Sequence, residues 1–373
     1  MTRGHAYDAD LRSDTPLLPL IKAEIAETGP MPVSRYADLC LQHPELGYYR
    51  KAQAIGAGGD FVTAPEISQV FGELIGLWSA FVWQQMGSPT QFELIEFGPG
   101  RGTLMADALR ATRTVPGFQD AANIRLVDVN RTLEEHVEDQ LATYLDRIAW
   151  GQPDPKNTLP RILIGNEYLD VFIPRQFQSR GGQWFERAVV FDTDGALQFG
   201  LSPKPAPAAL TPTGNPTDGL IYEANVMAPG LIRLIAQSSL IAGLFIDYGH
   251  TAQQLGDTLQ AVRSHAPEHP LTSPGEADLT CQVDFAAVAS AFRSAGAVVD
   301  GPVTQAEFLG SLGIIERASK LMSSNPQRAG DIEASILRLI APNGMGTRFK
   351  AIGIRSPDLP PLPAFPAPTT RTA

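Results

Sequence analysis

Cysteine is scarce in this chain, and its scarcity argues against several kinds of site. Only two of the 373 residues are cysteine, and Cys40 and Cys281 stand far apart and outside any metal-ligand spacing. A disulfide framework, a zinc knuckle or an iron–sulfur site needs cysteines at closer and more regular spacing. We therefore expect two reduced thiols and no bound metal.

Positive charge is also in short supply. The chain has 29 lysines and arginines against 40 aspartates and glutamates, which gives a formal net charge of −11. A protein that follows nucleic-acid phosphates presents a basic face, so this balance argues against a nucleic-acid partner. It suits a cationic partner, or serves solubility alone.

Long hydrophobic runs are missing as well. No stretch of about 18 apolar residues occurs, which argues against a membrane span. Asp8, Asp10 and Asp14 lie where a secretory or mitochondrial presequence avoids acidic residues. The sequence therefore predicts a soluble cytoplasmic protein.

A regular alternation of short apolar segments and helical segments begins at residue 92. Strands are predicted at 92–98, 124–130 and 161–170, and helices at 104–113 and 131–145 lie between them. Alternation of this kind indicates an α/β fold with a doubly wound parallel sheet.

Other segments surround this α/β pattern. Residues 1–90 are predicted to be a mostly helical region that contains a glycine-rich loop at 56–68. The α/β domain is assigned to residues 91–355. Within it, a period-two pattern followed by a proline-rich loop predicts an antiparallel β insertion at about 175–218. The proline-rich tail at 356–373 is expected to be disordered.

The segment "FELIEFGPGRGTL", residues 92–104, joins the first strand to a glycine-rich turn. Two features disfavour a dinucleotide there. Pro99 removes a backbone N–H that a phosphate would use, and Glu96 would meet a diphosphate with like charge. Both suit S-adenosylmethionine, which has no phosphate and carries an ammonium and a sulfonium. Gly98 and Gly100 let the backbone approach such a ligand closely.

The second predicted strand ends in another carboxylate, Asp128. Ligands bind at the carboxyl ends of strands in open parallel sheets, and a carboxylate there accepts hydrogen bonds from ribose hydroxyls. Aspartate also ends many strands for turn reasons alone. Because the glycine turn stands one strand earlier, we favour cofactor binding over a merely structural turn. Thr103 and Leu104 complete this cofactor-binding segment.

Several longer blocks identify a resemblance that covers about residues 30–350. They are "GPMPVSRYADLCLQHPELGYY", "GDFVTAPEISQVFGELIG", "LIEFGPGRGTL", "GNEYLDVF", "LFIDYGH", "GDTLQAVRSH" and "PGEADLTCQVDF". With these blocks the chain resembles the MidA family of bacterial and mitochondrial proteins. One departure follows "GNEYLD", where Ile173 precedes Pro174 in place of an expected proline.

The resemblance implies a class I methyltransferase fold with S-adenosylmethionine as methyl donor. It also implies a protein substrate, because the mitochondrial member of the family, in the matrix, symmetrically dimethylates one arginine in a core subunit of respiratory complex I. We therefore expect a protein arginine methyltransferase that acts on such a subunit or its bacterial equivalent. The alternative is a non-catalytic complex I assembly chaperone with the same fold. A nicotinamide-dependent oxidoreductase is disfavoured by Pro99 and Glu96.

An arginine acceptor requires carboxylates, because its guanidinium is always charged and delocalised. "GNEYLD" offers them at the end of a predicted strand. Glu167 is the first choice for gripping the guanidinium and Asp170 the second, while Asn166 would orient the cofactor amine or the substrate. The structural alternative is that Asn166 and Asp170 cap the segment that follows.

"FIDYGH" and "GDFVTAPEIS" supply further candidates, each with a structural alternative. Asp247 either pairs with the substrate cation or holds its loop, and His250 either accepts a proton or is structural. The resemblance implies that the loop at 56–68 is a lid, and Thr63 and Ser68 are its predicted cofactor contacts. The alternative is a helix entry with Ser68 as the N-cap.

"PGEADLT" places Glu276 or Asp278 either over the active site or at the start of the helix near Asp284.

Overall fold

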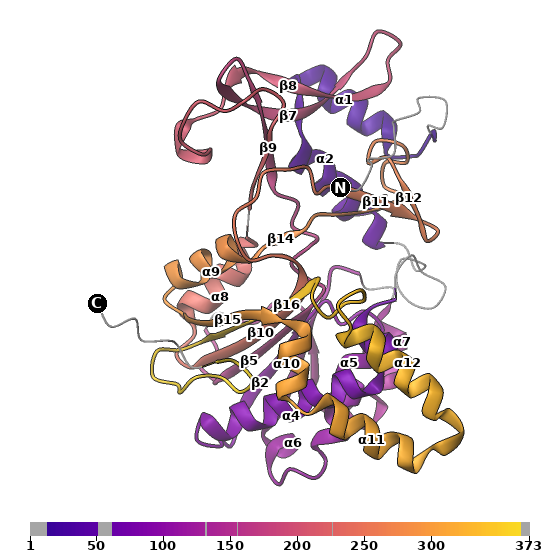
Figure 1. Cartoon of the computed structure of the whole chain (residues 1–373), viewed down its shortest axis with the longest axis vertical. Helices are drawn as coiled ribbons and strands as arrows, with labels where there is room; N and C mark the ends of the chain where they lie inside the picture. Colours follow the sequence, from indigo (N-terminus) through magenta and orange to yellow (C-terminus); the bar gives the residue numbers. More distant parts are fainter. Residues whose placement is uncertain (1–12, 51–61, 131–132, 155, 226, 367–373) are drawn as a thin grey trace.

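The computed structural model describes residues 13–50, 62–130, 133–154, 156–225 and 227–366. The chain forms two lobes, and the lower one in Figure 1 is built on the large sheet. The upper lobe gathers α1, α2, β7, β8, β9, β11 and β12, and β14 lies between the two.

The lower lobe contains a mixed sheet in the order β15-β16-β10-β5-β2-β3-β4, and β14 pairs with β10. Strands β4, β3, β2, β5 and β10 run parallel, whereas β16 is antiparallel to both of its neighbours. The predicted strands that begin the α/β pattern are present and parallel, but the whole sheet is mixed. The strands are β2 (Phe92–Phe97), β3 (Ala122–Val127), β4 (Ile148–Trp150), β5 (Arg161–Asn166), β10 (Ile241–His250), β14 (Val283–Asp284), β15 (Val298–Thr304) and β16 (Phe349–Arg355).

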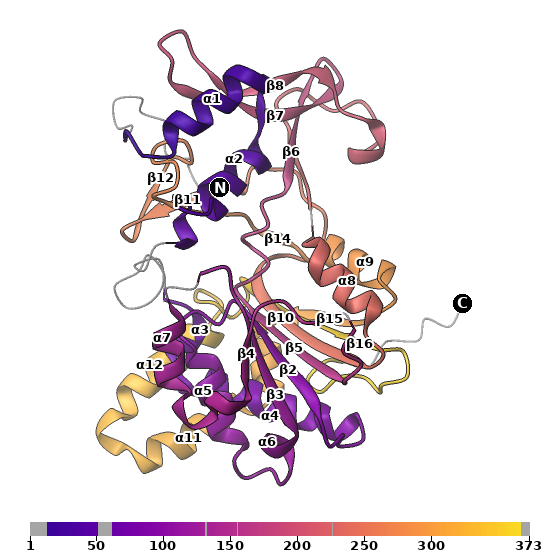
Figure 2. The ribbon, with the colours of Figure 1, turned by 180° about the vertical axis from the view of Figure 1, so that it is seen from behind.

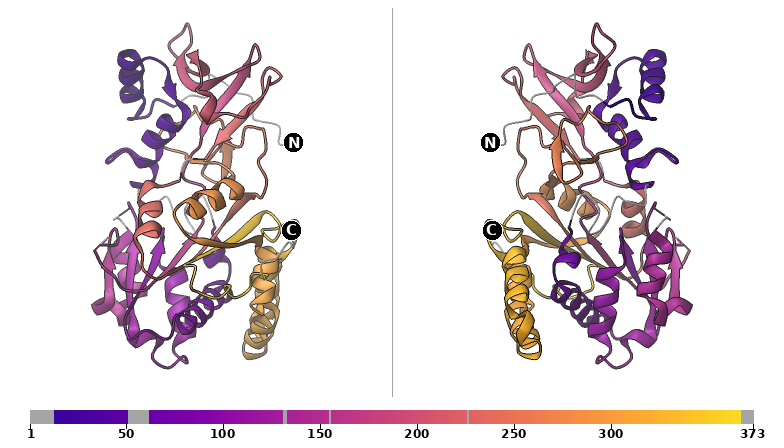
Figure 3. Two further views of the ribbon diagram at one scale, coloured as in Figure 1. Left: turned by 90° about the vertical axis from the view of Figure 1, so that its left-hand side faces the viewer. Right: turned by 90° about the vertical axis from the view of Figure 1, so that its right-hand side faces the viewer.

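Alternating side chains of the sheet contribute to two hydrophobic cores. Ile162 and Ile164 of β5 pack in one core with α4, α5, α10, α11 and α12, and Leu163 packs in the other with α8 and α9. Figures 2 and 3 show these two groups of helices on opposite faces of the sheet. The helices of this lobe are α3 (Ala64–Ile67), α4 (Gln69–Gln85), α5 (Thr103–Thr112), α6 (Phe118–Ala121), α7 (Glu134–Gln140), α8 (Pro229–Gln237), α9 (Phe285–Ser294), α10 (Gln305–Ser311), α11 (Ile314–Ser324) and α12 (Ala329–Ile340).

The upper lobe, here called the second lobe, has its own core. Ile21, Tyr36, Val189 and Leu279 come from distant parts of the sequence and are buried together in it. The predicted antiparallel meander is present as β6, β7 and β8. The elements of the second lobe are α1 (Leu18–Thr28), β1 (Met31–Pro32), α2 (Val33–Gln42), β6 (Arg175–Arg180), β7 (Gln183–Phe191), β8 (Leu197–Pro205), β9 (Ile221–Ala224), β11 (Gln260–Arg263), β12 (Ala266–Glu268), β13 (Asp278–Thr280) and the 3-10 turn η2 (Tyr48–Arg50).

Two expectations about the ends of the chain differ from this architecture. The helical region predicted at 1–90 is divided, because α1 and α2 belong to the second lobe and α4 packs on the sheet. Residues 356–366 of the tail are ordered, since Leu359 and Leu362 are buried and Trp78 donates a hydrogen bond to the carbonyl of Pro363 at 3.1 Å. Apolar side chains between the prolines anchor this segment. Residues 367–373 lie outside the described part.

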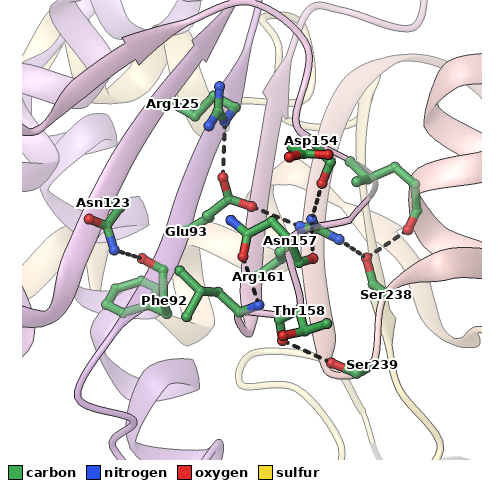
Figure 4. Close-up of polar contacts among 12 residues, drawn as sticks. Phe92, Glu93, Asn123, Arg125, Asp154, Asn157, Thr158, Arg161, Ser238 and Ser239 are labelled. Carbon is green, nitrogen blue, oxygen red and sulfur yellow. Dashed lines mark hydrogen bonds and ion pairs between the residues drawn. The ribbon is translucent and has the colours of Figure 1, made fainter.

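A buried ion-pair network holds the amino-terminal end of the sheet (Figure 4). Arg161, the first residue of β5, is fully buried and pairs with Glu93 at 2.9 Å. It also donates to the Ser238 hydroxyl at 2.9 Å and to two carbonyls of the loop 154–157. Arg125 pairs with the other oxygen of Glu93 at 3.0 Å. This network ties three strands and two loops together at the end remote from Asn166.

In the described part of the chain, no helix has the length and apolar character needed to cross a bilayer.

Candidate active site

A cavity of about 1050 Å³ lies at the carboxyl ends of the parallel strands, where the two lobes meet. From the sheet side it is lined by the turn after β2, by Asp128 after β3, by the segment 166–173 after β5 and by Tyr248 of β10. From the second lobe it is lined by residues of α2, η2, β6, β7, β11 and β13. Both lobes therefore form its walls.

The glycine turn between β2 and α5 has a backbone conformation that requires glycine. Gly98, Gly100 and Gly102 have φ values of 66°, 53° and 79°, in the left-handed region that favours glycine. Gly98 donates its N–H to the carbonyl of Val127 at 2.9 Å, which fixes the turn to the end of β3. Thr103 then begins α5.

Glu96 and Asp128 stand on either side of this turn. Glu96 is 3% exposed, and burial raises its pKa to about 8, with the charge of Asp128 adding to the effect. Burial also raises the pKa of Asp128, although backbone N–H groups of Asn130 and Val129 oppose this by donating to it. Within the described chain, Glu96 Oε2 is buried without a hydrogen-bond partner.

Glu167 follows β5 in a strained conformation, with a φ of 50° for a non-glycine residue. Its Oε1 accepts hydrogen bonds from the backbone N–H of Ala64 and from Asn166 Nδ2, both at 3.1 Å. The carboxylate is thereby tied to the first residue of α3. Burial is the main cause that raises the pKa of Glu167 to about 7.

Asp170 lines the cavity and is 8% exposed. Burial raises its pKa to about 6, against a hydrogen bond donated by the hydroxyl of Tyr248. Among the residues that the structure describes, nothing bonds to its buried Oδ1. Asp170 thus presents an unmatched acceptor in the wall of the cavity.

Asp247, a predicted catalytic residue, does not line the cavity. It is fully buried, and its Oδ2 accepts from the backbone N–H groups of Leu169 (2.8 Å) and Asp170 (3.2 Å). Its Oδ1 accepts from the N–H of Tyr248 at 2.9 Å. Burial and the charges of Asp170 and Glu167 raise its pKa well above the usual range. Of the two roles considered, Asp247 holds the loop.

Of the two residues predicted to contact the cofactor from the lid, one lines the cavity and the other does not. Thr63 lines the cavity, and the Thr103 hydroxyl beside it donates to Glu66. Ser68, predicted to contact the cofactor, instead caps α4 by accepting from the N–H of Val70 at 3.4 Å, and its side chain does not line the cavity. The lid glycines Gly58 and Gly59 lie outside the described residues.

The remaining alternatives are resolved by contacts. His250 Nδ1 lies 2.7 Å from the carbonyl of Ala252, away from the cavity. Asp278 lines the cavity, whereas Glu276 does not. The helix near Asp284 is capped by Asp284 itself, which accepts from two backbone N–H groups at its start.

Sequence reasoning missed several residues of the cavity wall. Tyr168 and Tyr248 lie inside the quoted motifs, but no feature of those motifs gives a tyrosine a role. Tyr49 lies in the block ending "GYY", which carried the family resemblance without a role. Arg338 comes from α12 and had no signal in the sequence.

The buried acceptor atoms that lack a hydrogen-bond partner are complementary to the donor groups of a methyl-donor cofactor. Glu96 Oε2 and Asn166 Oδ1 are both buried acceptors without a partner in the described regions. S-adenosylmethionine would bring ribose hydroxyls and an ammonium as donors. A left-handed glycine turn beside two acidic strand ends therefore defines the class of S-adenosylmethionine-dependent α/β proteins.

A family model covers residues 74–303 of the chain, and its description is "Putative S-adenosyl-L-methionine-dependent methyltransferase". The chain belongs to this family of methyltransferases.

Individual relatives agree with that membership. The zebrafish (Danio rerio) mitochondrial protein arginine methyltransferase NDUFAF7 is 33% identical, over 91% of this chain and 86% of its own. The human protein of that name is 32% identical, and the alignment covers 90% of this chain and 82% of the human protein. A crystal structure from Burkholderia thailandensis with bound S-adenosyl-homocysteine is 29% identical, has a TM-score of 0.83, and aligns over 93% of this chain and 94% of its own. The family resemblance and the cofactor predicted from the sequence are confirmed.

Proposed function

We propose that this protein transfers methyl groups from S-adenosylmethionine to an arginine side chain of a protein substrate. The observation that carries the proposal is a single cavity with two sets of carboxylates, Glu96 and Asp128 in one and Glu167 and Asp170 in the other. Donor sulfonium and acceptor guanidinium are both cations, so both ends of the cavity need negative charge. The names of the zebrafish and human relatives support this substrate class.

The mixed sheet is, in this proposal, the class I methyltransferase fold. Chain order reverses beside β2, since β3 and β4 follow on one side of it and β5 and β10 on the other. Ligands of open α/β sheets bind at such a switch point, outside the carboxyl ends of the strands. Glu96 near the end of β2 and Asn166 at the end of β5 flank that point.

The donor end of the cavity works by binding and orientation. S-adenosylmethionine supplies an already activated methyl group, so the protein needs no covalent nucleophile. Asp128 would accept hydrogen bonds from the ribose hydroxyls and Glu96 would accept one from the ammonium, and Gly98 would allow close approach of the backbone. Thr103 and Leu104 line the same wall.

The acceptor end grips the guanidinium. Glu167 Oε1 is fixed by Ala64 and Asn166, and no described residue bonds to its Oε2. That oxygen is assigned to the guanidinium, with Asp170 as the second carboxylate. Asp247 is a positioning residue, because it holds the backbone that carries Asp170. Exclusion of water from this buried end strengthens both ion pairs.

The proposed target is a core subunit of respiratory complex I or its bacterial equivalent, as the family resemblance implies. The test is incubation of the protein with that subunit and S-adenosylmethionine labelled in its methyl group. We expect label in the subunit, and labelling about 100-fold slower with the Glu167→Gln variant. A stable complex without label would favour the assembly chaperone instead.

A further inference from the structure

Four residues from both lobes gather around the buried carboxylate of Asp170 at the junction. Asp170 and Tyr248 come from the sheet, and Tyr49, Asp278 and Thr280 come from the second lobe. All five line the cavity. Asp170, Asp278 and Thr280 are less than a tenth exposed.

Contacts within the second lobe and across the junction connect this group. The Tyr49 hydroxyl donates to Asp278 Oδ1 at 2.7 Å. Tyr248 of the sheet lies close enough to Asp170 to lower the pKa of that carboxyl, and Thr280 lies close enough to Tyr248 to lower the pKa of its hydroxyl. The backbone N–H of Cys281, next to β13, donates to the carbonyl of Asp170 at 3.2 Å. The second lobe is therefore bonded directly to the loop that carries Asp170.

Asp170 itself lacks a compensating charge. No lysine or arginine of the described chain pairs with it, and its Oδ1 is buried without a donor. The tyrosines near it bring no positive charge. A buried carboxylate in this state is unfavourable unless a cation joins it. Tyr49 and Tyr248 both line the cavity, and aromatic rings attract guanidinium groups.

We propose that Asp170 and the Tyr49–Asp278 pair form a guanidinium subsite that is incomplete without the second lobe. This inference rests on the proposed function, because the cation it receives is the arginine side chain of the protein substrate. Glu167 holds the guanidinium from the side of α3, and the subsite holds it from the side of the second lobe. Tyr49 and Asp278 are therefore specificity-determining residues.

The raised pKa values agree with this arrangement. The charges of Asp278 and Asp170, after burial itself, raise the pKa of Tyr49 well above its usual value. Tyr49 therefore stays protonated and remains a donor to Asp278 at any pH near neutrality. A bound guanidinium would stabilise the ionised form of Asp170.

Binding of a peptide tests the subsite separately from catalysis. The probe is a peptide of the candidate subunit with one arginine, titrated into the full-length protein with S-adenosylhomocysteine present. The matched probe has citrulline, which has the same shape without the charge. We expect Tyr49→Phe and Asp278→Asn to weaken arginine-peptide binding by about 10-fold or more, as for hydrogen bonds to charged groups. Affinity for S-adenosylhomocysteine should stay within about twofold of the parent.

Tyr222→Phe is the control, because Tyr222 lies on β9 of the second lobe and does not line the cavity. It should bind the arginine peptide like the parent. Equal affinity of the parent for the arginine and citrulline peptides would overturn the subsite, as would full arginine binding by Tyr49→Phe. Preference for arginine without methyl transfer would uphold the subsite and reject the proposed function.

Discussion

Glu167 has a strained backbone, a hydrogen bond to the first residue of α3 and a carboxylate oxygen, Oε2, to which no described residue bonds. Its left-handed conformation is held by a hydrogen bond from its own N–H to the carbonyl of Ile246 at 2.8 Å. Its side chain meets the N–H of Ala64. Strain of this kind persists only where the surrounding structure enforces it, and such sites are often functional.

Replacement of Glu167 by Gln keeps the shape of the side chain and removes its charge. We expect methyl transfer to fall by about 100-fold, the effect of removing a well-placed acid–base group. Cofactor affinity should change little, because Glu96 and Asp128 lie at the other end. Initial rates with labelled donor and titration with S-adenosylhomocysteine measure the two quantities. Activity within about twofold of the parent would show that Glu167 is only structural.

The acceptor carboxylates also predict a pH dependence. Burial raises the pKa of Asp170 to about 6 and of Glu167 to about 7, and only the ionised forms attract a guanidinium. We therefore expect kcat/KM to rise from about pH 5 to about pH 8 in the parent. In Glu167→Gln the upper part of the rise should disappear. A flat profile in the parent would contradict ionisation of these groups in the free enzyme.

Glu96 makes the stability of the ligand-free protein depend on pH. Its folded pKa of about 8 lies above the ordinary value of 4.5. The contribution of protonated Glu96 to the free energy of unfolding is complete below pH 4.5, the pKa of an ordinary glutamate. It is lost as the pH rises through about 8, the pKa in the folded protein. Glu96→Gln has no proton to lose. The Tm of this variant, relative to that of the parent, should therefore increase as the pH is raised from about 5 to about 9. A constant difference between the two would show that Glu96 does not ionise while buried.

Strand-end reasoning from the sequence found the carboxylates that line the cavity at the ends of β2, β3 and β5. Glu96, Asp128 and Glu167 each follow or end a buried strand, and parallel strands bring such residues together. The same reasoning could not separate Asp247 from them. The direction of its side chain depends on the backbone of the neighbouring loop, 77 and 78 residues away in sequence, which folds over it.

At the scale of elements, the sheet is specified locally and the second lobe is not. Each strand of the α/β pattern is a short apolar run between helices, so periodicity predicts it. The second lobe combines α1 and α2 with β6–β9 and β11–β13, and contacts such as that of the Tyr36 hydroxyl with the carbonyl of Pro270 join them. Pairings over such separations leave no local pattern, so Tyr49 and Asp278 could not be placed together from the sequence.

The network at the amino end of β5 should matter for stability. Arg161→Ala leaves Glu93 buried with a lost partner, and breaking a buried ion pair in this way costs about 3–5 kcal/mol. Urea unfolding followed by fluorescence measures the loss. Arg125→Ala is the control, because Arg125 is 20% exposed and pairs with the same carboxylate. Its effect should be less than half as large. Equal effects would mean that the burial of Arg161 is unimportant.

For the molecule as a whole, the active cavity is a product of two lobes and of an acidic chain. The lobes close over the carboxyl end of the sheet, and both supply carboxylates to one space. The formal net charge of −11 adds a long-range attraction for cationic partners. The substrate is therefore expected to be a cationic segment of a protein, recognised beyond its arginine.

Salt should slow the reaction with a protein substrate. Raising ionic strength from about 0.05 M to about 0.5 M screens attraction between separated charges, so kcat/KM should fall several-fold. Free arginine buries too little surface to be held in a cavity of this size and should be a poor acceptor. Steady-state assays with both acceptors over a salt series measure this. Equal efficiency with free arginine, and no salt effect, would indicate a small-molecule methyltransferase.

The central claim is that the methyl group goes to an arginine of a protein. Tandem mass spectrometry of the complex I subunit, after incubation with the protein and S-adenosylmethionine, locates the modification directly. The expected result is one arginine carrying added methyl groups with the parent protein, and a much lower extent of methylation at that arginine, after the same time, with Glu167→Gln. Methyl groups on another residue type, or an unmodified subunit that binds the protein tightly, would contradict the claim.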